Sequence, residues 1–84
     1  MDLDAEHHNT VEQIFARPSS GNVEWRRVRS LLDEVATVTE ERKGRLSVTL
    51  GGETNVLEAP RSKDVDTQML VDLRRMLTRA GITP

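Results

Sequence analysis

Two long segments of the chain repeat apolar residues at helical spacing. The first begins after Asn22, a residue type that favours a helix N-cap, and carries on one side Trp25, Val28, Leu31, Leu32 and Val35. The second, from about Val65 to Ala80, has a stripe of Met69, Leu70, Leu73, Met76, Leu77 and Ala80. One apolar face on each segment predicts two amphipathic helices that pack on the same core. Gly81 then stands where a left-handed helix cap is expected.

Between these helices the apolar spacing changes to two residues. The stretch 36–42 alternates weakly and 45–50 alternates cleanly, which predicts two strands. The Gly51-Gly52 pair predicts a tight hairpin to a third strand that Pro60 ends, with Leu46 opposite Leu57. Short turns throughout indicate an antiparallel meander. Its outer face is expected to stay in water and to present Thr37, Thr39, Ser47, Thr49, Thr54, Val56 and Glu58.

The whole chain predicts one small domain. Residues 1–9 are polar and predict a loose N-terminal tail, whereas residues 10–84 predict a single α+β domain. Thr10 and Gln13 have the spacing of a capping box, so a short helical turn is expected from about Val11 to Ala16. The order helix–strand–strand–strand–helix, with a three-stranded antiparallel sheet and two long helices on one face, is the plan of the double-stranded RNA-binding domain.

Composition removes several classes of function. The 84 residues include no cysteine, so a disulfide framework, a zinc–thiolate site and a thiol nucleophile are excluded. No paired carboxylates, nucleophile triad, phosphate loop or metal-ligand spacing occurs, so no cofactor or metal is expected and a conventional small-molecule enzyme is the weakest hypothesis. No apolar run would span a bilayer and the polar N-terminus does not predict a secretory signal. We therefore expect a cytoplasmic protein without a membrane partner.

The charge balance leaves room only for a local basic surface. The net charge is −2, and Phe15 and Trp25 are the only aromatic residues, so a base-stacking platform is not expected. Three cations flank Gly44 in the turn predicted between the first two strands, and others lie near the helix starts. This candidate RNA-binding set consists of Arg26, Arg42, Lys43, Arg45, Arg61 and Lys63.

Each part of this set has a functional and a plain interpretation, which for Arg26 are a groove contact and a solvated helix face. In a double-stranded RNA-binding domain the loop between the first two strands reaches a minor groove, so its cations would hold phosphates. The alternative is a solvated turn in which Glu40 and Glu41 offset the charge. Before the closing helix an anion would find a favourable helix N-terminus, although Asp64 and Asp66 are candidate caps there.

Three segments, "IFARPSSGNVEW", "EERKGRLSVTLGG" and "MLVDLRRMLTRAGI", together resemble the HicA-like toxins of bacterial toxin–antitoxin systems. The likeness covers most of residues 11–83 and is nearest to a branch with an extra N-terminal helical turn. It implies the double-stranded RNA-binding fold, cleavage of messenger RNA and an antitoxin protein that covers the site. The family typically carries its catalytic histidine in a Gly-Ser-His motif at the start of the second strand. Here Arg45 or Leu46 takes that place.

The departure from the family motif separates binding from cleavage. Glu58 and Ser62 stand where relatives can carry further histidines, and the only histidines are His7 and His8, in the expected tail. RNA cleavage by 2′-hydroxyl attack needs a base with a pKa near neutrality, which histidine supplies. The sequence therefore names no catalytic residue and favours a degenerate, RNA-binding member. The alternative is a protein-interaction module that docks a partner, such as an antitoxin-like protein, on the sheet.

Overall fold

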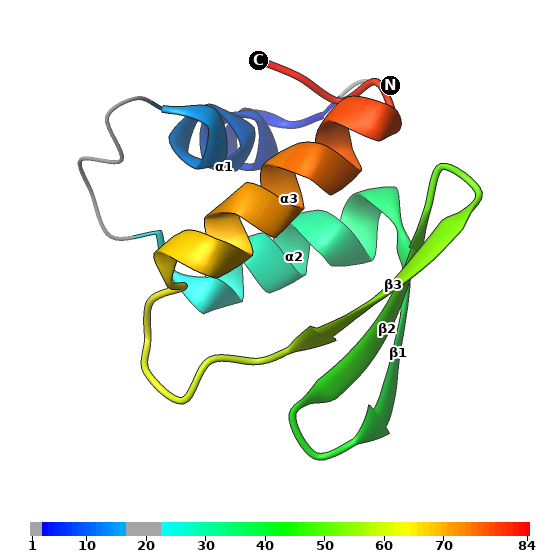
Figure 1. Ribbon diagram of the computed structural model, residues 1–84. Coiled ribbons are helices and arrows are strands. Elements are labelled where there is room, and N and C mark those ends of the chain that lie inside the picture. Colours follow the sequence, from blue (N-terminus) through cyan, green and yellow to red (C-terminus); the bar gives the residue numbers. More distant parts are fainter. Residues whose placement is uncertain (1–2, 17–22) are drawn as a thin grey trace.

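The computed structural model describes residues 3–16 and 23–84. Within them the chain forms three helices and three strands, which are labelled in Figure 1. In chain order they are α1 (Ala5–Phe15), α2 (Trp25–Val35), β1 (Thr37–Arg42), β2 (Arg45–Leu50), β3 (Glu53–Glu58) and α3 (Thr67–Arg79). The sheet is antiparallel with the order β1-β2-β3, so the predicted α+β class and the meander are confirmed. None of the helices in this described part has the length and apolar character needed to cross a bilayer.

The hairpin between β2 and β3 has the register that its two-glycine turn predicts. Leu46 lies opposite Leu57. Gly51 and Gly52 have φ angles of 62° and 85°, a backbone region that disfavours side chains. A Cβ atom on Gly51 would also lie 3.2 Å from the Cβ atom of Ala80. The turn therefore needs glycine both for its shape and for its close contact with the end of α3.

One apolar core joins the sheet to the helices. Leu46 and Val48 of β2, Leu31 of α2 and Leu73 of α3 are each at most 1% exposed. Figure 1 shows α2 and α3 on the same side of the sheet. The opposite face presents hydroxyl groups and charged residues to solvent, as predicted. Trp25, expected in the core, is only half-buried at its margin.

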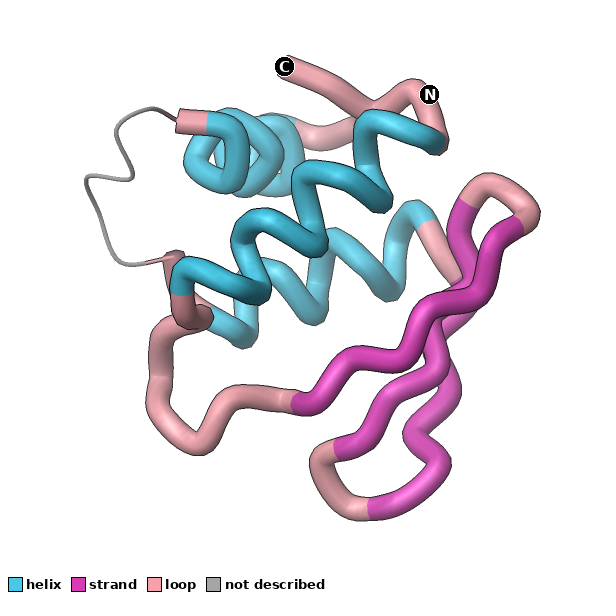
Figure 2. Tube along the Cα trace, in the orientation of Figure 1, coloured by secondary structure: helices cyan, strands magenta, loops and turns pink. Residues whose placement is uncertain are grey.

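The starts of α2 and α3 are bound to each other. The backbone N–H of Trp25 donates to the carbonyl oxygen of Lys63 (2.8 Å), and that of Val65 donates to the carbonyl oxygen of Val23 (2.9 Å). Both helices therefore begin at one end of the molecule and run toward the β2–β3 turn, as the path of the tube in Figure 2 shows. This end carries the loop that leads from β3 into α3.

The N-terminal helix begins earlier than the sequence predicted. α1 starts at Ala5 rather than near Val11, so much of the predicted tail over residues 1–9 is helical. Val11 and Ile14 are 0% exposed, and α1 packs on α2 and α3 on the side away from the sheet (Figure 1). The helix is thus part of the domain, because its buried face completes the core.

The cap of α1 explains the difference. The Asp4 carboxylate accepts a hydrogen bond from the His7 backbone N–H (2.8 Å) and caps the helix. Thr10, the predicted cap, is buried within the helix six residues after Asp4, and its hydroxyl donates to the Glu6 carbonyl oxygen (3.1 Å). Both residue types favour helix starts, and the packing of the helix selects Asp4.

The long helices also begin slightly later than predicted. Glu24 stands at the N-cap of α2, while Asn22, the predicted cap, lies outside the described residues. α3 begins at Thr67, and the carboxylate of its cap, Asp66, accepts a hydrogen bond from the Met69 N–H (2.8 Å).

The C-terminal end of α3 agrees with the sequence. Gly81 has a φ angle of 79°, and Ile82 N–H donates to the carbonyl oxygen of Leu77 (2.9 Å). The Gly81 N–H donates to the carbonyl oxygen of Thr78 (3.0 Å), which completes a Schellman ending.

Candidate nucleic-acid interface

The turn between β1 and β2 holds three of the candidate cations in solvent. Arg42 and Arg45 lie opposite each other in the strand register, and Lys43 lies at the tip of the turn. All three side chains are exposed. Gly44 supplies the positive φ angle of 81° that the turn requires. The strand register shifts just before Arg42, which marks a bulge that bends the end of β1. The turn is therefore a protruding basic loop.

A hydrogen bond ties this turn to the loop that follows β3. The Ala59 N–H donates to the Gly44 carbonyl oxygen over 2.7 Å. The loop continues through Arg61 to Lys63, whose backbone is bound to the start of α2. The β1–β2 turn, the loop and the start of α2 consequently lie at one end of the molecule (Figure 1). We call this surface the basic end, and its cations are Arg26, Arg42, Lys43, Arg45, Arg61 and Lys63.

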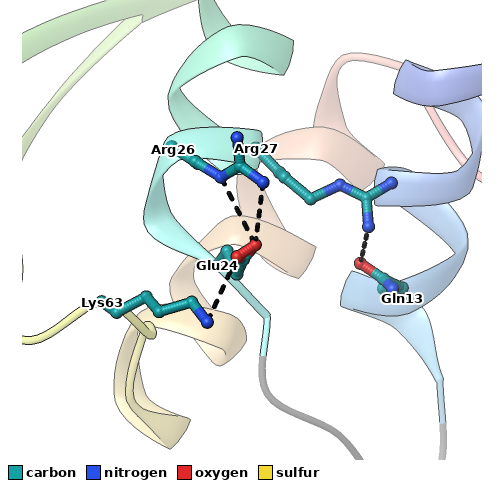
Figure 3. Close-up of polar contacts among 5 residues, drawn as sticks. All are labelled: Gln13, Glu24, Arg26, Arg27 and Lys63. Atoms are coloured by element: carbon teal, nitrogen blue, oxygen red, sulfur yellow. Dashed lines mark hydrogen bonds and ion pairs between the residues drawn. The ribbon is translucent and has the colours of Figure 1, made fainter.

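Two of these cations share one carboxylate. The Arg26 guanidinium donates to Glu24 Oε1 from Nε and Nη2, both over 3.4 Å, and Lys63 Nζ lies 3.7 Å from Glu24 Oε2. Figure 3 shows the two cations approaching Glu24 from different sides. The hydrogen bond from Arg26 lowers the pKa of Glu24, the charges of Arg26 and Lys63 lower it further, and partial burial opposes them. Glu24 thus stays ionised and offsets part of the local positive charge.

Sequence patterns did not single out Glu24. It stands at the N-cap of α2, but its side chain makes no capping hydrogen bond and turns to the cations instead. Figure 3 also shows Arg27 reaching the other way, to α1, where its guanidinium donates to Gln13 Oε1 (3.4 Å). Adjacent arginines therefore have different roles, because one faces the basic end and the other joins two helices.

The remaining cations of the basic end are less constrained. Arg45 Nε lies 3.9 Å from Glu41 Oε1, at the limit of an ion pair. Within residues 3–16 and 23–84, no carboxylate forms an ion pair with Arg42, Lys43 or Arg61. These three side chains are exposed, so their charges are available to an anionic partner.

The start of α3 contributes less to anion binding than its position indicates. Its cap, Asp66, already accepts a hydrogen bond from a first-turn N–H group. A phosphate near this end would meet the negative charge of Asp66 as well as the exposed side chains of Arg61 and Lys63. Side-chain cations are therefore the main anion-binding groups of the basic end.

The positions that carry histidines in HicA-like proteins hold other residues in this chain. Leu46 is 1% exposed and faces the core, so Arg45 is the residue that reaches solvent where β2 begins. Arg45 lies opposite Glu58 of β3, and the Ser62 hydroxyl donates to the Asp64 carbonyl oxygen (3.0 Å). An arginine holds a phosphate but does not accept a proton at pH 7. This surface can therefore bind an anion without supplying the expected base.

Both histidines lie on α1, away from the basic end. His7 Nε2 is 2.9 Å from Ser30 Oγ, and its ring, 13% exposed, joins α1 to α2. Asp4 Oδ1 is 3.2 Å from His7 Nδ1, yet that nitrogen makes no hydrogen bond to it because Oδ1 faces the backbone of the helix cap. His8 is exposed beside Glu12. We interpret the His7 contact as structural; the sequence missed it because Ser30 lies on another helix.

Metal binding finds no support in the described part of the chain, where no three histidine or carboxylate side chains are grouped to hold an ion. Comparison of the chain with family models, with curated proteins and with solved structures found no match. The function therefore has to be argued from the residues and their geometry.

Proposed function

We propose that this chain binds RNA through its basic end, as a HicA-like member of a toxin–antitoxin type system that does not cleave its target. The hydrogen bond between Ala59 and Gly44 carries the proposal, because it holds the β1–β2 turn beside the loop after β3. Cations from three separate segments then share one surface. Grouped lysine and arginine side chains that face solvent are the chemistry that phosphate backbones recognise.

The order of elements from α2 to α3 supports structured RNA as the ligand. It follows the plan of the double-stranded RNA-binding domain, in which the loop between the first two strands enters a minor groove. Trp25 is packed against the core and Phe15 lies on α1, so the described part of the basic end offers no aromatic ring on which a base would stack. Contacts to the backbone of a duplex therefore fit this surface better than contacts to unpaired bases.

An affinity measurement on a short RNA duplex tests the proposal. Fluorescence anisotropy with a labelled duplex of about 20 base pairs compares the wild type with a Lys43→Ala, Arg61→Ala double variant. Loss of two phosphate contacts is expected to weaken binding by about tenfold or more. Arg75→Ala is the matched control, since it removes an exposed arginine on α3, outside the basic end. Equal affinity of the double variant and the wild type, or no binding by the wild type, would contradict the proposal.

A second assay separates binding from cleavage. The same RNA, incubated with the protein and resolved on a denaturing gel, is expected to remain intact, because Arg45 replaces the family's base. Expression in bacteria should likewise cause no growth arrest at good soluble yield. A cleavage product that disappears with Arg45→Ala would show that the chain is an active ribonuclease.

A further inference from the structure

The two outer edges of the sheet are protected to different degrees. β1 has a bulge between Glu40 and Arg42 and three charged residues at its end, two devices that discourage the addition of another strand. β3 pairs with β2 in unbroken register, and the interior of β3, residues 54–57, is uncharged. The edge at β3 is therefore the one that remains able to accept a strand.

Free backbone groups line this edge. The two-residue turn makes its flanking residue pair hydrogen-bonded, and bonded and non-bonded pairs alternate from there along the hairpin. The N–H and C=O groups of Thr54, Val56 and Glu58 therefore point away from β2. Across the described residues, no turn, cap or loop hydrogen bond uses these outward groups. An extended chain would find three residues with donor and acceptor groups ready to pair.

A hollow of about 200 Å³ lies between this edge and α3. Leu57 of β3 and Met76 of α3 are each 6% exposed and give it an apolar floor. Val56, on the outer face, is 50% exposed. The lining includes Val56 and Leu57 of β3, so the hollow borders the open edge. Figure 1 shows β3 and α3 on the near side of the molecule. Alternate side chains of an added strand would thus meet the apolar floor on one face and Val56 on the other.

One cation at the hollow has no ionic partner. Arg79 Nη1 is 3.4 Å from Glu53 Oε1, so these two charges offset each other, while Asp72 keeps its charge and accepts a hydrogen bond from the neutral Gln68 amide (3.2 Å). Arg75 lines the hollow and forms no ion pair with a carboxylate in the part of the chain that the structure describes. Arg75 also lines a second hollow of about 450 Å³ on the outer side of α3, next to Val71. A partner with an acidic residue at this point would neutralise Arg75.

We propose that the edge of β3 receives an extended segment of a partner protein as a fourth strand, with an apolar residue over Leu57 and Met76 and an acidic residue toward Arg75. A second copy of the chain fits less well. Antiparallel pairing of two β3 strands through their outward groups, centred on Val56, would place the polar Asn55 of each copy opposite Leu57 of the other, over the apolar floor. The proposal does not depend on RNA binding, because the hollow and the basic end are lined by different residues.

A selection experiment tests this edge. A phage-displayed library of random peptides of about 12 residues, long enough for a strand of 5–6 residues, is selected on the full chain. The enriched peptides should alternate apolar and polar residues and include aspartate or glutamate. Val56→Pro removes an outward N–H group without taking a bond from the ladder to β2, and should weaken these peptides about tenfold or more. Arg75→Glu should shift the selected peptides from acidic to basic.

Glu40→Pro is the matched control, because it makes the same kind of change at the β1 edge and should leave peptide affinity unchanged. Thermal melts establish that each variant is folded, and Arg75→Glu, an exposed helical position, keeps the test valid if the proline is not tolerated. Selected peptides that bind both the Val56→Pro and Arg75→Glu variants as tightly as the wild type would overturn the proposal. So would a selection that enriches no peptide, or a dimer in sedimentation experiments that Val56→Pro dissociates. Unchanged RNA affinity of Val56→Pro would separate this surface from the basic end.

Discussion

Glu24 lies between Arg26 and Lys63 and couples the stability of the helix starts to pH. Its pKa in the folded protein is below the ordinary value of 4.5, chiefly because Arg26 donates a hydrogen bond to the ionised carboxylate. A lowered folded pKa contributes stability that is complete above the unfolded pKa and is lost as the pH falls through the folded one. Glu24→Gln should therefore lower the free energy of unfolding at pH 7, and the difference should vanish as the solution is acidified below 4.5. Urea titrations of both proteins across this range measure it, and a pH-independent difference would contradict this account.

The same carboxylate should oppose RNA binding. Glu24 attracts Arg26 and Lys63 and brings a negative charge to the basic end. Glu24→Gln is therefore expected to strengthen binding to the RNA duplex while it weakens the fold, and Glu12→Gln on the exposed face of α1 is the control. Anisotropy titrations at one salt concentration compare the RNA affinity of Glu24→Gln with that of the wild type and of Glu12→Gln. Weaker binding by a folded Glu24→Gln variant would place Glu24 in the interface as a direct contact.

The residue types of the candidate site were predictable, but their partners were not. Spacing around Gly44 and before the closing helix was enough to select five of the six cations, and the sixth, Arg26, was selected on the first long helix. The contact between Glu24 and Lys63 was not visible, because it depends on the backbone pairing of two segments far apart in the chain. The contact between His7 and Ser30 was missed for the same reason.

At the scale of elements, α1 is the part whose role differs most from the prediction. Ile14 is 0% exposed, and Arg74 of α3 donates to its carbonyl oxygen over 2.6 Å, so α1 is held by both packing and a hydrogen bond. Ile14→Ala should lower the free energy of unfolding by about 2–5 kcal/mol, as expected for a truncated buried isoleucine. Glu12→Ala, an exposed change on the same helix, should alter it by no more than about 0.5 kcal/mol. Urea unfolding compares them, and equal small effects would mean that α1 is a dispensable tail.

The elements with the strongest local chemistry were the ones that the sequence predicted best. The Gly51-Gly52 turn defined the hairpin register, and Gly81 defined the end of α3, because both depend on backbone conformations that glycine adopts readily. The start of α1 depended on which of two cap-forming residues was packed inside the helix, as Thr10 is, and which was left at its exposed end, as Asp4 is. That choice is made by the packing against α2 and α3, which periodicity over a short polar segment does not reveal.

At the scale of the whole molecule, one arrangement explains how a chain of net charge −2 presents a basic surface. The parallel starts of α2 and α3 and the bond between Gly44 and Ala59 bring cations from three segments to one end. The open edge of β3 lies beside α3 and carries different side chains. The sites proposed for a polyanion and for an extended peptide thus lie on separate surfaces, and variants at one should not affect the other.

The salt dependence of RNA binding is the most direct test of the basic end. Each phosphate contact that displaces a counterion adds about −0.9 to the slope of log Kobs against log salt for a double helix. We predict a clearly negative slope for the wild type, less steep by about two for the Lys43→Ala, Arg61→Ala variant, and unchanged for Arg75→Ala. The same slope for the double variant and the wild type, or an affinity that does not respond to salt, would contradict the proposal that this end of the molecule holds RNA.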